Sequence, residues 1–177
     1  MIRITGGKYR SRKLFIPENG LTKPTMDKVR AAVFNALNED IIDKKILDLF
    51  SGSGSYGFEA LSRGAKEVTF VDKEISAIST IKQNAQLLKE NNLKIIKSDV
   101  ISYLENCNDK FDIIFVDPPY KLEIYEVVVN LLENNNLLNK DAIIVLESEK
   151  DLNIKEDNYK KVKLYNYGLA KIYILRK

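Results

Sequence analysis

Five short apolar runs alternate along the chain with stretches whose apolar residues recur at helical spacing. Near-continuous apolar strands separated by helices are typical of a parallel sheet that is covered on both faces. The alternation therefore predicts an α/β fold. The runs are KILDLF, EVTFVD, LKIIKS, FDIIFVD and AIIVLES, and the helices between them are expected at 56–63, 74–90, 100–106 and 123–133.

The two ends of the chain depart from this alternation. Near the N-terminus, IRIT and RKLFIP predict two strands around a Gly-Gly turn, and a helix is expected from Thr25 to about Leu37. At the C-terminus, KKVKLYNY and LAKIYILRK flank Gly168 without room for a helix, so they predict a hairpin that adds an antiparallel strand to the sheet. We expect a small basic β-hairpin extension over residues 1–25 and one globular domain over 26–177.

The composition excludes several kinds of chemistry. The 177 residues include no histidine and a single cysteine, Cys107. Histidine-based hydrolysis, histidine metal sites and an intramolecular disulfide are therefore excluded, and no metal site is expected. No apolar stretch reaches the roughly 18 residues of a membrane span, and the N-terminus lacks the layout of a signal peptide. We expect a cytoplasmic protein without a membrane partner.

Charge is distributed unevenly along the chain. Residues 1–30 carry a net charge of +6, whereas the remaining residues carry −3. A basic arm on a mildly acidic body is the electrostatic pattern of a nucleic-acid-binding protein, although a lysine-rich arm can also serve solubility alone. The candidate RNA contacts are Lys8, Arg10, Arg12, Lys13, Lys23 and Arg30.

The segment LDLFSGSGSYG, residues 47–57, is an apolar strand that enters a glycine-rich turn. Gly52, Gly54 and Gly57 fit the pattern G-x-G-x-x-G, and Asp72 follows at the spacing expected of a ribose-binding acid. Taken alone, this pattern indicates only a dinucleotide site. Asp48, however, precedes the glycines, where a carboxylate would oppose a pyrophosphate and favour a cationic ligand end. S-adenosylmethionine has such an end, in its ammonium and its sulphonium.

A second motif closes the run FDIIFVDPPY, residues 111–120. Consecutive prolines hold a chain extended and stiff, so the carbonyl of Pro118 is aimed in a fixed direction. That carbonyl beside the Asp117 carboxylate, followed by Pro119 and the aromatic face of Tyr120, suits a planar group with an exocyclic amine. Nucleobases are such groups, although a strand that merely ends at a Pro-Pro turn is the alternative. These four residues are the predicted catalytic set.

With both motifs on one chain, the sequence resembles the class I S-adenosylmethionine-dependent methyltransferases. The segments IRITGGKYRSRKL and KPTMDKVRAAVFN narrow the resemblance to the RsmD family, the 16S ribosomal RNA guanine-N2 methyltransferases. Lys23 and Ser11 depart mildly from the family pattern. The resemblance implies a Rossmann-like fold with a seven-stranded, mostly parallel sheet, and S-adenosylmethionine as cofactor. The implied cofactor-binding residues are Asp48, Phe50, Gly52, Gly54, Asp72 and Asp99.

In such a sheet, ligands bind beyond the carboxyl ends of the strands, where these acids and the DPPY motif would meet. Asp99 would accept the adenine amino group, although a helix N-cap is an equal alternative. The expected reaction is methyl transfer to guanine N2 in 16S ribosomal RNA, within the assembled or assembling small subunit, by a monomer. Three alternatives stay open: methylation of adenine N6, nicotinamide-dependent oxidoreduction, and RNA binding without catalysis.

Overall fold

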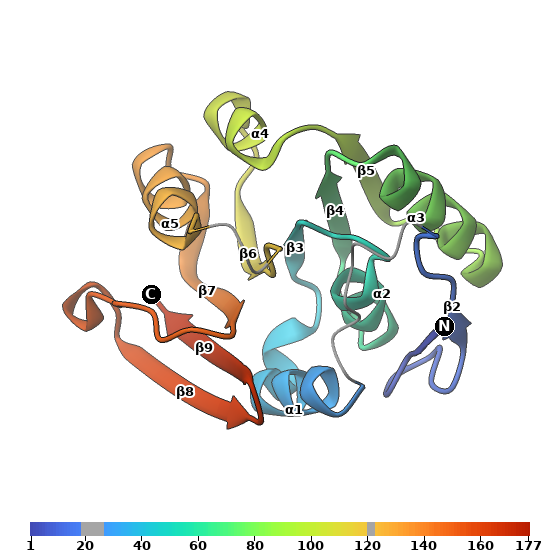
Figure 1. Cartoon of the computed structure of the whole chain (residues 1–177), viewed down its shortest axis with the longest axis horizontal. Coiled ribbons are helices and arrows are strands. Elements are labelled where there is room, and N and C mark those ends of the chain that lie inside the picture. Colours follow the sequence, from blue (N-terminus) through green and yellow to red (C-terminus); the bar gives the residue numbers. More distant parts are fainter. Residues whose placement is uncertain (19–26, 120–122) are drawn as a thin grey trace.

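The computed structural model describes residues 1–18, 27–119 and 123–177. A seven-stranded sheet forms its centre, in the order β5-β4-β3-β6-β7-β9-β8 (Figure 1). The apolar runs predicted as strands all form strands of this sheet, which confirms the α/β class and the strand count. Its strands are β3 Lys45–Leu49, β4 Glu67–Asp72, β5 Leu93–Lys97, β6 Phe111–Val116, β7 Leu138–Ser148, β8 Lys161–Tyr167 and β9 Ala170–Arg176.

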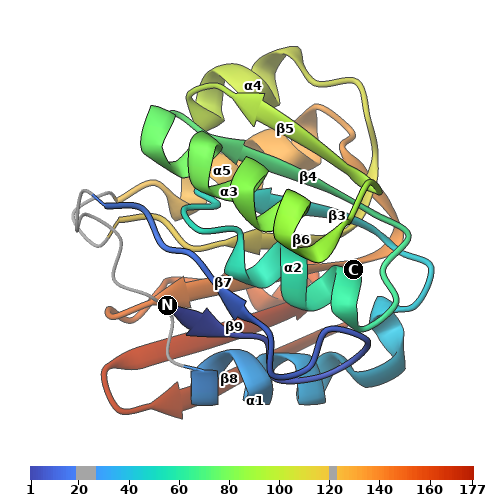
Figure 2. The same cartoon turned by 90° about the vertical axis from the view of Figure 1, so that its right-hand side faces the viewer.

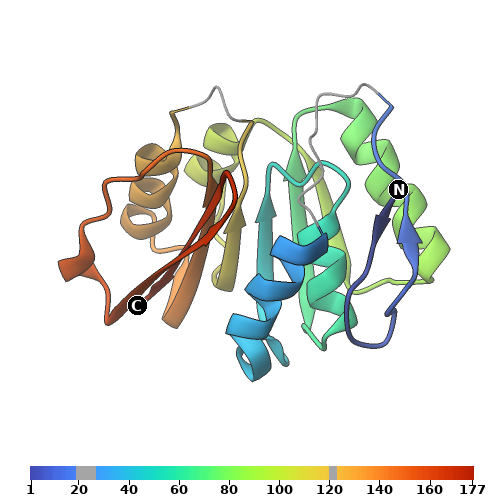
Figure 3. The ribbon, with the colours of Figure 1, turned by 60° about the horizontal axis from the view of Figure 1, so that its bottom comes forward.

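Helices cover both faces of the sheet, as expected (Figure 3). On one face, α1, α2 and α3 pack against alternate residues of the strands through apolar side chains that include Phe34, Phe58 and Ile81. On the other face, α4 and α5 cover a second cluster through residues such as Leu104 and Leu132. The helices are α1 Asp27–Leu37, α2 Ser55–Ser62, α3 Ile75–Leu88, α4 Val100–Asn106 and α5 Tyr125–Asn134, with 3-10 helices at Asn38–Ile41 and Glu156–Asn158.

The strand order reverses next to β3. This strand pairs in parallel with β4 on one side and with β6 on the other, with Leu49 opposite both Val71 and Val116. The chain therefore leaves β3 in one direction and later returns to its other side. In doubly wound sheets the ligand crevice opens at such a reversal, beyond the carboxyl ends of the strands. The glycine turn and the Asp-Pro-Pro segment both begin there.

The C-terminal hairpin confirms the predicted antiparallel addition, and the pairing of its strands shows which strand joins the parallel part of the sheet. β9 pairs antiparallel with β7, and β8 then pairs antiparallel with β9 and forms the edge of the sheet. Gly168 occupies the turn with a φ of 63°, a conformation that glycine adopts without steric cost.

The N-terminal strands are shorter than the sequence predicts. β1 Ile2–Arg3 and β2 Lys13–Leu14 pair antiparallel over two residues each. The chain between them lies along α2 (Figure 2), because Thr5 and Gly6 donate their amides to the Glu59 carboxylate instead of to a strand partner. Ile4 and Leu14 are part of the buried cluster beneath α1 and α2. The first residues are thus packed onto the body of the protein.

The predicted helix start at Thr25 lies outside the described residues. Within the described ranges, none of the helices has both the length and the hydrophobicity needed to cross a membrane.

Candidate active site

The glycine turn after β3 is shaped by close packing. Gly54 is the N-cap of α2 with a φ of 76°, and a Cβ built there would lie 2.8 Å from the Phe58 ring. A Cβ on Gly57 would lie 2.2 Å from the ring of Phe70 on β4, a contact that real side chains do not make. These two glycines therefore let the first turn of α2 sit directly on the sheet.

Ser51 holds this turn, and sequence reasoning missed it. Its hydroxyl donates to the carbonyl of Asp48 (2.6 Å) and accepts the amide of Val71 (2.8 Å). The side chain thus joins the end of β3 to the end of β4. A serine inside a glycine-rich turn carries no distinctive signal, because such turns commonly contain serine.

Asp48 is buried, with 3% of its surface exposed, and its Oδ2 accepts the amide of Gly57 at 2.9 Å. Burial raises the pKa of this carboxyl to about 8, the Gly57 hydrogen bond opposes the shift, and the nearby Asp72 adds to it. A cation placed beside Asp48 would offset the cost of its buried charge. The group therefore suits a positively charged ligand end, as the sequence predicts.

Asp72 ends β4 and holds the same turn from the other side. Its Oδ2 accepts the amide of Gly52 at 2.8 Å, and its Oδ1 accepts the amide of Glu74 at 2.9 Å. The carboxylate is buried at the edge of the sheet, beside the glycines. Its predicted contact with ribose hydroxyls stays a prediction, and the structure adds a role in fixing the loop.

The remaining two predicted cofactor residues lie at the same edge. Phe50 follows β3 with a φ of 57°, unusual for an aromatic residue, and packs partly buried against the cluster under α4 and α5. Asp99 is exposed and caps α4, because its Oδ1 accepts the amides of Ile101 (2.9 Å) and Ser102 (3.3 Å). The N-cap alternative for Asp99 is thus present, which leaves its contact with adenine a prediction.

The Asp-Pro-Pro segment follows β6, beside the glycine turn that follows β3. Asp117 is partly buried, Pro118 is buried and Pro119 is exposed, while Tyr120 lies outside the described residues. Since Leu49 and Val116 are partners in neighbouring strands, Asp117 starts within one strand spacing of Phe50, about 5 Å. The fold therefore brings the two sequence motifs together, although Phe50 and Asp117 are 67 positions apart in the chain.

Two tyrosines and a glutamate adjoin Asp117, and none of the three is among the catalytic or cofactor-binding residues predicted from the sequence. Tyr56 on α2 stacks on Phe115 of β6 with ring centroids 4.8 Å apart, and its hydroxyl donates to Oε2 of Glu147 at 2.7 Å. Tyr125 at the start of α5 donates its hydroxyl to the backbone carbonyl of Glu147 at 2.7 Å. An acid at the end of the apolar run AIIVLES was the available signal, because a buried carboxylate needs partners.

The charges of Asp117 and Glu147 both affect these tyrosines. The pKa of Tyr56 is raised well above its usual value, first by burial and then by the Glu147 and Asp117 charges. The pKa of Tyr125 is raised to about 12, mainly by burial, with contributions from Asp117 and Glu147. Both hydroxyls therefore stay protonated and act as hydrogen-bond donors at neutral pH.

One of the predicted RNA contacts is wrong. Arg30 is fully buried, where its Nε lies 3.3 Å from Glu59 and its Nη2 lies 2.8 Å from Asp27 and also donates to the carbonyl of Arg3. A guanidinium held in this way ties α1 to α2 and to the N-terminal strand and is not presented to RNA. A basic residue at a buried position of a helix cannot be told from an exposed one by its charge alone.

The other basic candidates lie on the surface, except that Lys23 is outside the described residues. Arg10, Arg12 and Lys13 are exposed, and Lys8 pairs with Glu90 at 2.8 Å while keeping half of its side chain exposed. Lys8 and its neighbour Tyr9 both contact the same Glu90 oxygen. The basic arm is thus pinned to the end of α3 and presents its remaining charges outward.

Glu59 organises the arm, a role that no pattern in the sequence indicates. This fully buried carboxylate accepts hydrogen bonds from Thr5, Gly6, Arg30 and Arg63. Arg63 is four residues away along the chain, whereas the other three donors are at least 29 residues away. Asn84 acts similarly, because its amide nitrogen donates to the carbonyls of Phe15 and Ser53. The N-terminal arm is therefore held directly beside the glycine turn.

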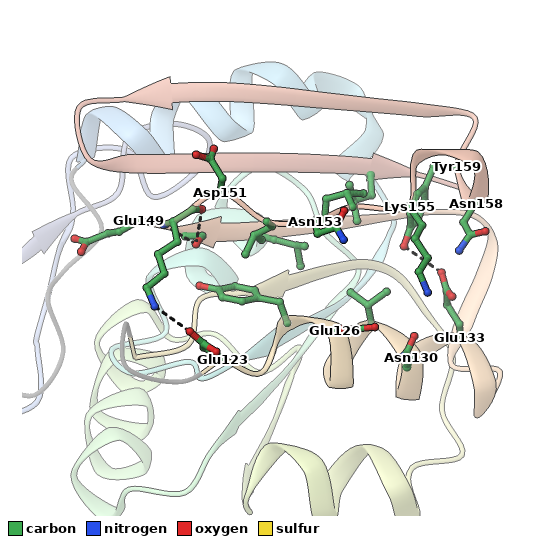
Figure 4. A pocket seen from close by; sticks show the side chains of 18 residues that line it. Glu123, Glu126, Asn130, Glu133, Glu149, Asp151, Asn153, Lys155, Asn158 and Tyr159 are labelled. Carbon is green, nitrogen blue, oxygen red and sulfur yellow. Dashed lines mark hydrogen bonds and ion pairs between the residues drawn. The ribbon is translucent and has the colours of Figure 1, made fainter.

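A cavity of about 410 Å³ lies between α5 and the segment that follows β7 (Figure 4). Glu126 and Asn130 of α5 face it from one side and Asn153 and Lys155 from the other. Of the described residues that were predicted as catalytic or cofactor-binding, none lines this cavity. Tyr125 does, so the cavity borders the reaction motif without containing it.

A family model described as conserved hypothetical protein 95 matches residues 2–176. The chain belongs to this family. Together with the two relatives described next, this match confirms the predicted resemblance to RsmD and the prediction that the protein is a methyltransferase.

Two relatives in this family are each named ribosomal RNA small subunit methyltransferase D. The protein from Escherichia coli K12 is 40% identical over 148 residues, which cover 84% of this chain and 75% of the relative. The protein from Haemophilus influenzae is 38% identical over 154 residues, covering 85% of this chain and 80% of the relative.

Solved structures share the fold. A methylase from Haemophilus influenzae, HI0767, superposes with a TM-score of 0.83 at 33% identity, over 99% of this chain and 97% of that one. RsmC of Thermus thermophilus, a 16S rRNA N2 methyltransferase solved with AdoMet and guanosine, gives a TM-score of 0.71 at 20% identity. This match covers 92% of this chain and 45% of that one, and it supports the fold alone.

Proposed function

We propose that this protein transfers a methyl group from S-adenosylmethionine to the exocyclic N2 amine of a guanine in 16S ribosomal RNA. The observation that carries the proposal is the placement of Asp117 and Pro118 beside the glycine turn, on adjacent strand ends of one crevice. An acid and an aimed carbonyl next to a methyl-donor site are what an amine nucleophile requires. The small-subunit RNA methyltransferases related to this chain point to the same substrate.

The residues of the crevice fit S-adenosylmethionine. The cofactor would supply an electrophilic methyl group on a positively charged sulphur. Asp48 would face the cationic methionine end, because burial leaves this carboxylate in need of a positive neighbour. Asp72 would accept the ribose hydroxyls and Asp99 the adenine amine, while Phe50, Gly52 and Gly54 would form the wall of the site. The packing of Gly54 against Phe58 leaves no room for a side chain there.

Asp117 and Pro118 would prepare the nucleophile. The lone pair of guanine N2 is delocalised into the ring, and hydrogen bonds from its two protons to the Asp117 carboxylate and the Pro118 carbonyl would favour a more tetrahedral nitrogen. As the N–C bond forms and the bond from the methyl group to the donor sulphur breaks, positive charge would pass from sulphur to nitrogen. The Asp117 carboxylate would stabilise that charge through a charge-assisted hydrogen bond and would take up the proton that N2 then releases. Pro119 stiffens the segment, and Tyr120 would stack on the extruded base.

The basic arm would contribute RNA contacts. We propose that residues 1–25 act as a basic extension of the catalytic domain over 26–177, with Lys8, Arg10, Arg12, Lys13 and Lys23 near the phosphates. Changing Arg10 and Arg12 together to alanine should make the negative slope of log affinity against log salt shallower by about 1 to 2. The reason is that each phosphate contact that is lost no longer releases its counterions on binding. Lys110→Ala with Lys140→Ala, exposed lysines at the opposite strand ends, is the matched control.

The arm is small for the selection of one nucleotide in a large RNA. We therefore propose that the substrate is the assembled or assembling small ribosomal subunit, which supplies further recognition surface, and that the protein acts as a cytoplasmic monomer. Equal methylation rates on naked 16S RNA and on assembled subunits would contradict the first point. Sedimentation at micromolar concentration would test the second.

The deciding experiment is transfer of labelled methyl from S-adenosylmethionine to small subunits from a strain that lacks this gene, followed by nucleoside analysis. N2-methylguanosine at a single site is the expected product. N6-methyladenosine would keep the mechanism and move the substrate. An absence of transfer to either base would overturn the proposal.

A further inference from the structure

A second carboxylate lies beside Asp117 at the reaction edge. β6 and β7 are parallel neighbours, with Phe115 opposite Val145 and Val116 opposite Leu146. Asp117 follows Val116 and Glu147 follows Leu146, so their backbones lie about one strand spacing apart, about 5 Å. Phe115 and Val145 point to the same face, the one covered by α1 and α2, and strand alternation places Glu147 on that face as well.

Glu147 is held in a defined position. The Tyr56 hydroxyl donates to its Oε2 at 2.7 Å, and the Tyr125 hydroxyl donates to its backbone carbonyl at 2.7 Å. The ring of Tyr56 is itself fixed by stacking on Phe115 and by Phe34, whose centroid lies 6.2 Å away. The residue is 4% exposed, so its carboxylate is largely shielded from water.

Guanine and adenine differ at the atom next to the exocyclic amine. Guanine carries a proton on N1 beside the N2 amine, so its edge offers two adjacent donors to carboxylate oxygens. Adenine has an unprotonated N1 with a lone pair, which a carboxylate repels. A site built to accept a hydrogen bond from substrate rejects an analogue that lacks the donor far more strongly than an apolar pocket rejects a change in size.

We propose that Glu147 is the specificity-determining residue that accepts the N1 proton of the target guanine while Asp117 and Pro118 hold the N2 amine. Tyr56 is then a positioning residue that orients this carboxylate. The inference rests on the proposed function and assigns the choice of base to a residue outside the Asp-Pro-Pro-Tyr motif. That motif suits any planar exocyclic amine, so base selection requires a further group of this kind.

The test uses 2-aminopurine at the target position of reconstituted small subunits. This base keeps the exocyclic amine of guanine but has an acceptor at N1. The unaltered protein should methylate the guanine substrate at least ~10- to 100-fold more efficiently, as kcat/KM, than the 2-aminopurine substrate. Glu147→Gln, whose amide can still accept the Tyr56 hydrogen bond and can donate to N1, should lower activity on guanine and raise relative activity on 2-aminopurine.

Controls separate this role from a structural one. Glu123→Gln changes an exposed carboxylate that lies just before α5 and pairs with Lys150. This variant should leave the ratio of kcat/KM on guanine to kcat/KM on 2-aminopurine unchanged. Tyr56→Phe should lower kcat on guanine. Its preference for guanine over 2-aminopurine, as the ratio of kcat/KM, should lie between that of the unaltered protein and that of Glu147→Gln. An equal loss on both substrates in Glu147→Gln would overturn the inference, whereas failure of the unaltered protein to methylate guanine would overturn the proposed function itself.

Discussion

The predicted cofactor side and the predicted reaction side of the candidate site hold their carboxylates by different means. On the cofactor side, Asp48 and Asp72 accept backbone amides of the glycine turn, from Gly57 and Gly52. On the reaction side, Glu147 is held by the hydroxyl of Tyr56, a side chain from a different element. The cofactor half is therefore built mainly by the local path of the chain. The reaction half depends on side chains that packing brings together from α2, α5, β6 and β7.

The largest effect is expected at Asp117. Asp117→Ala removes the carboxylate that holds the amine and stabilises the charge that develops on nitrogen, so methyl transfer should fall by roughly 10³-fold. Because this residue follows β6 and is not among the acids that bind the glycine turn, affinity for S-adenosylmethionine should change little. Single-turnover transfer and calorimetric binding would measure the two quantities. A parallel loss of cofactor affinity would break the distinction between the halves.

A smaller effect is expected at Asp72, where substitution should weaken cofactor binding and leave most of the turnover rate intact. Asp72→Ala removes the acceptor of the Gly52 and Glu74 amides, so both the glycine turn and the ribose contact should weaken. Affinity for S-adenosylmethionine should fall by about 10- to 100-fold, the cost of one or two charge-assisted hydrogen bonds. Turnover at saturating cofactor should recover most of its rate. A loss that saturation does not restore would mean that Asp72 acts in the chemical step.

The third expectation concerns pH and Asp48. In the cofactor-free protein its pKa is about 8, because burial disfavours the charge. A cationic ligand beside it would lower that pKa, so binding below about pH 8 should release a proton from Asp48. Affinity should then rise with pH by up to about tenfold per unit and level off above about pH 8. Calorimetry in buffers of different ionisation enthalpy would count the released protons.

Asp48→Asn is the matched control for this effect. The amide keeps the size of the side chain and can still accept the Gly57 amide, but it does not titrate. The amino group of the cofactor titrates in both proteins, so the difference between them isolates Asp48. The raised pKa also means that the unbound protein loses stability as pH rises from about 4 to about 8, which the variant should not do. Identical pH profiles for the two proteins would refute the assignment of Asp48 to the cationic end.

Most of the fold could be predicted from the sequence. The alternation of apolar runs and helical periods places all five of the mutually parallel strands and four of the helices within a few residues, because such patterns reflect which side of each element is buried. The N-terminal strands were predicted too long, since the Glu59 carboxylate takes up amides that a longer hairpin would have paired. The interior position of Arg30 has the same origin, because the same carboxylate is its partner.

Three motifs of this protein follow directly from its amino-acid sequence: the βα alternation, the glycine turn with Asp48 and Asp72, and the Asp-Pro-Pro segment. These are local, since each depends on the backbone preferences and charges of neighbouring residues. Which distant groups contact these motifs depends on how the elements pack in three dimensions. Glu59 binds Thr5 across 54 residues, and Tyr56 binds Glu147 across 91. A buried carboxylate must find donors wherever packing supplies them, and periodicity along the chain does not encode that choice.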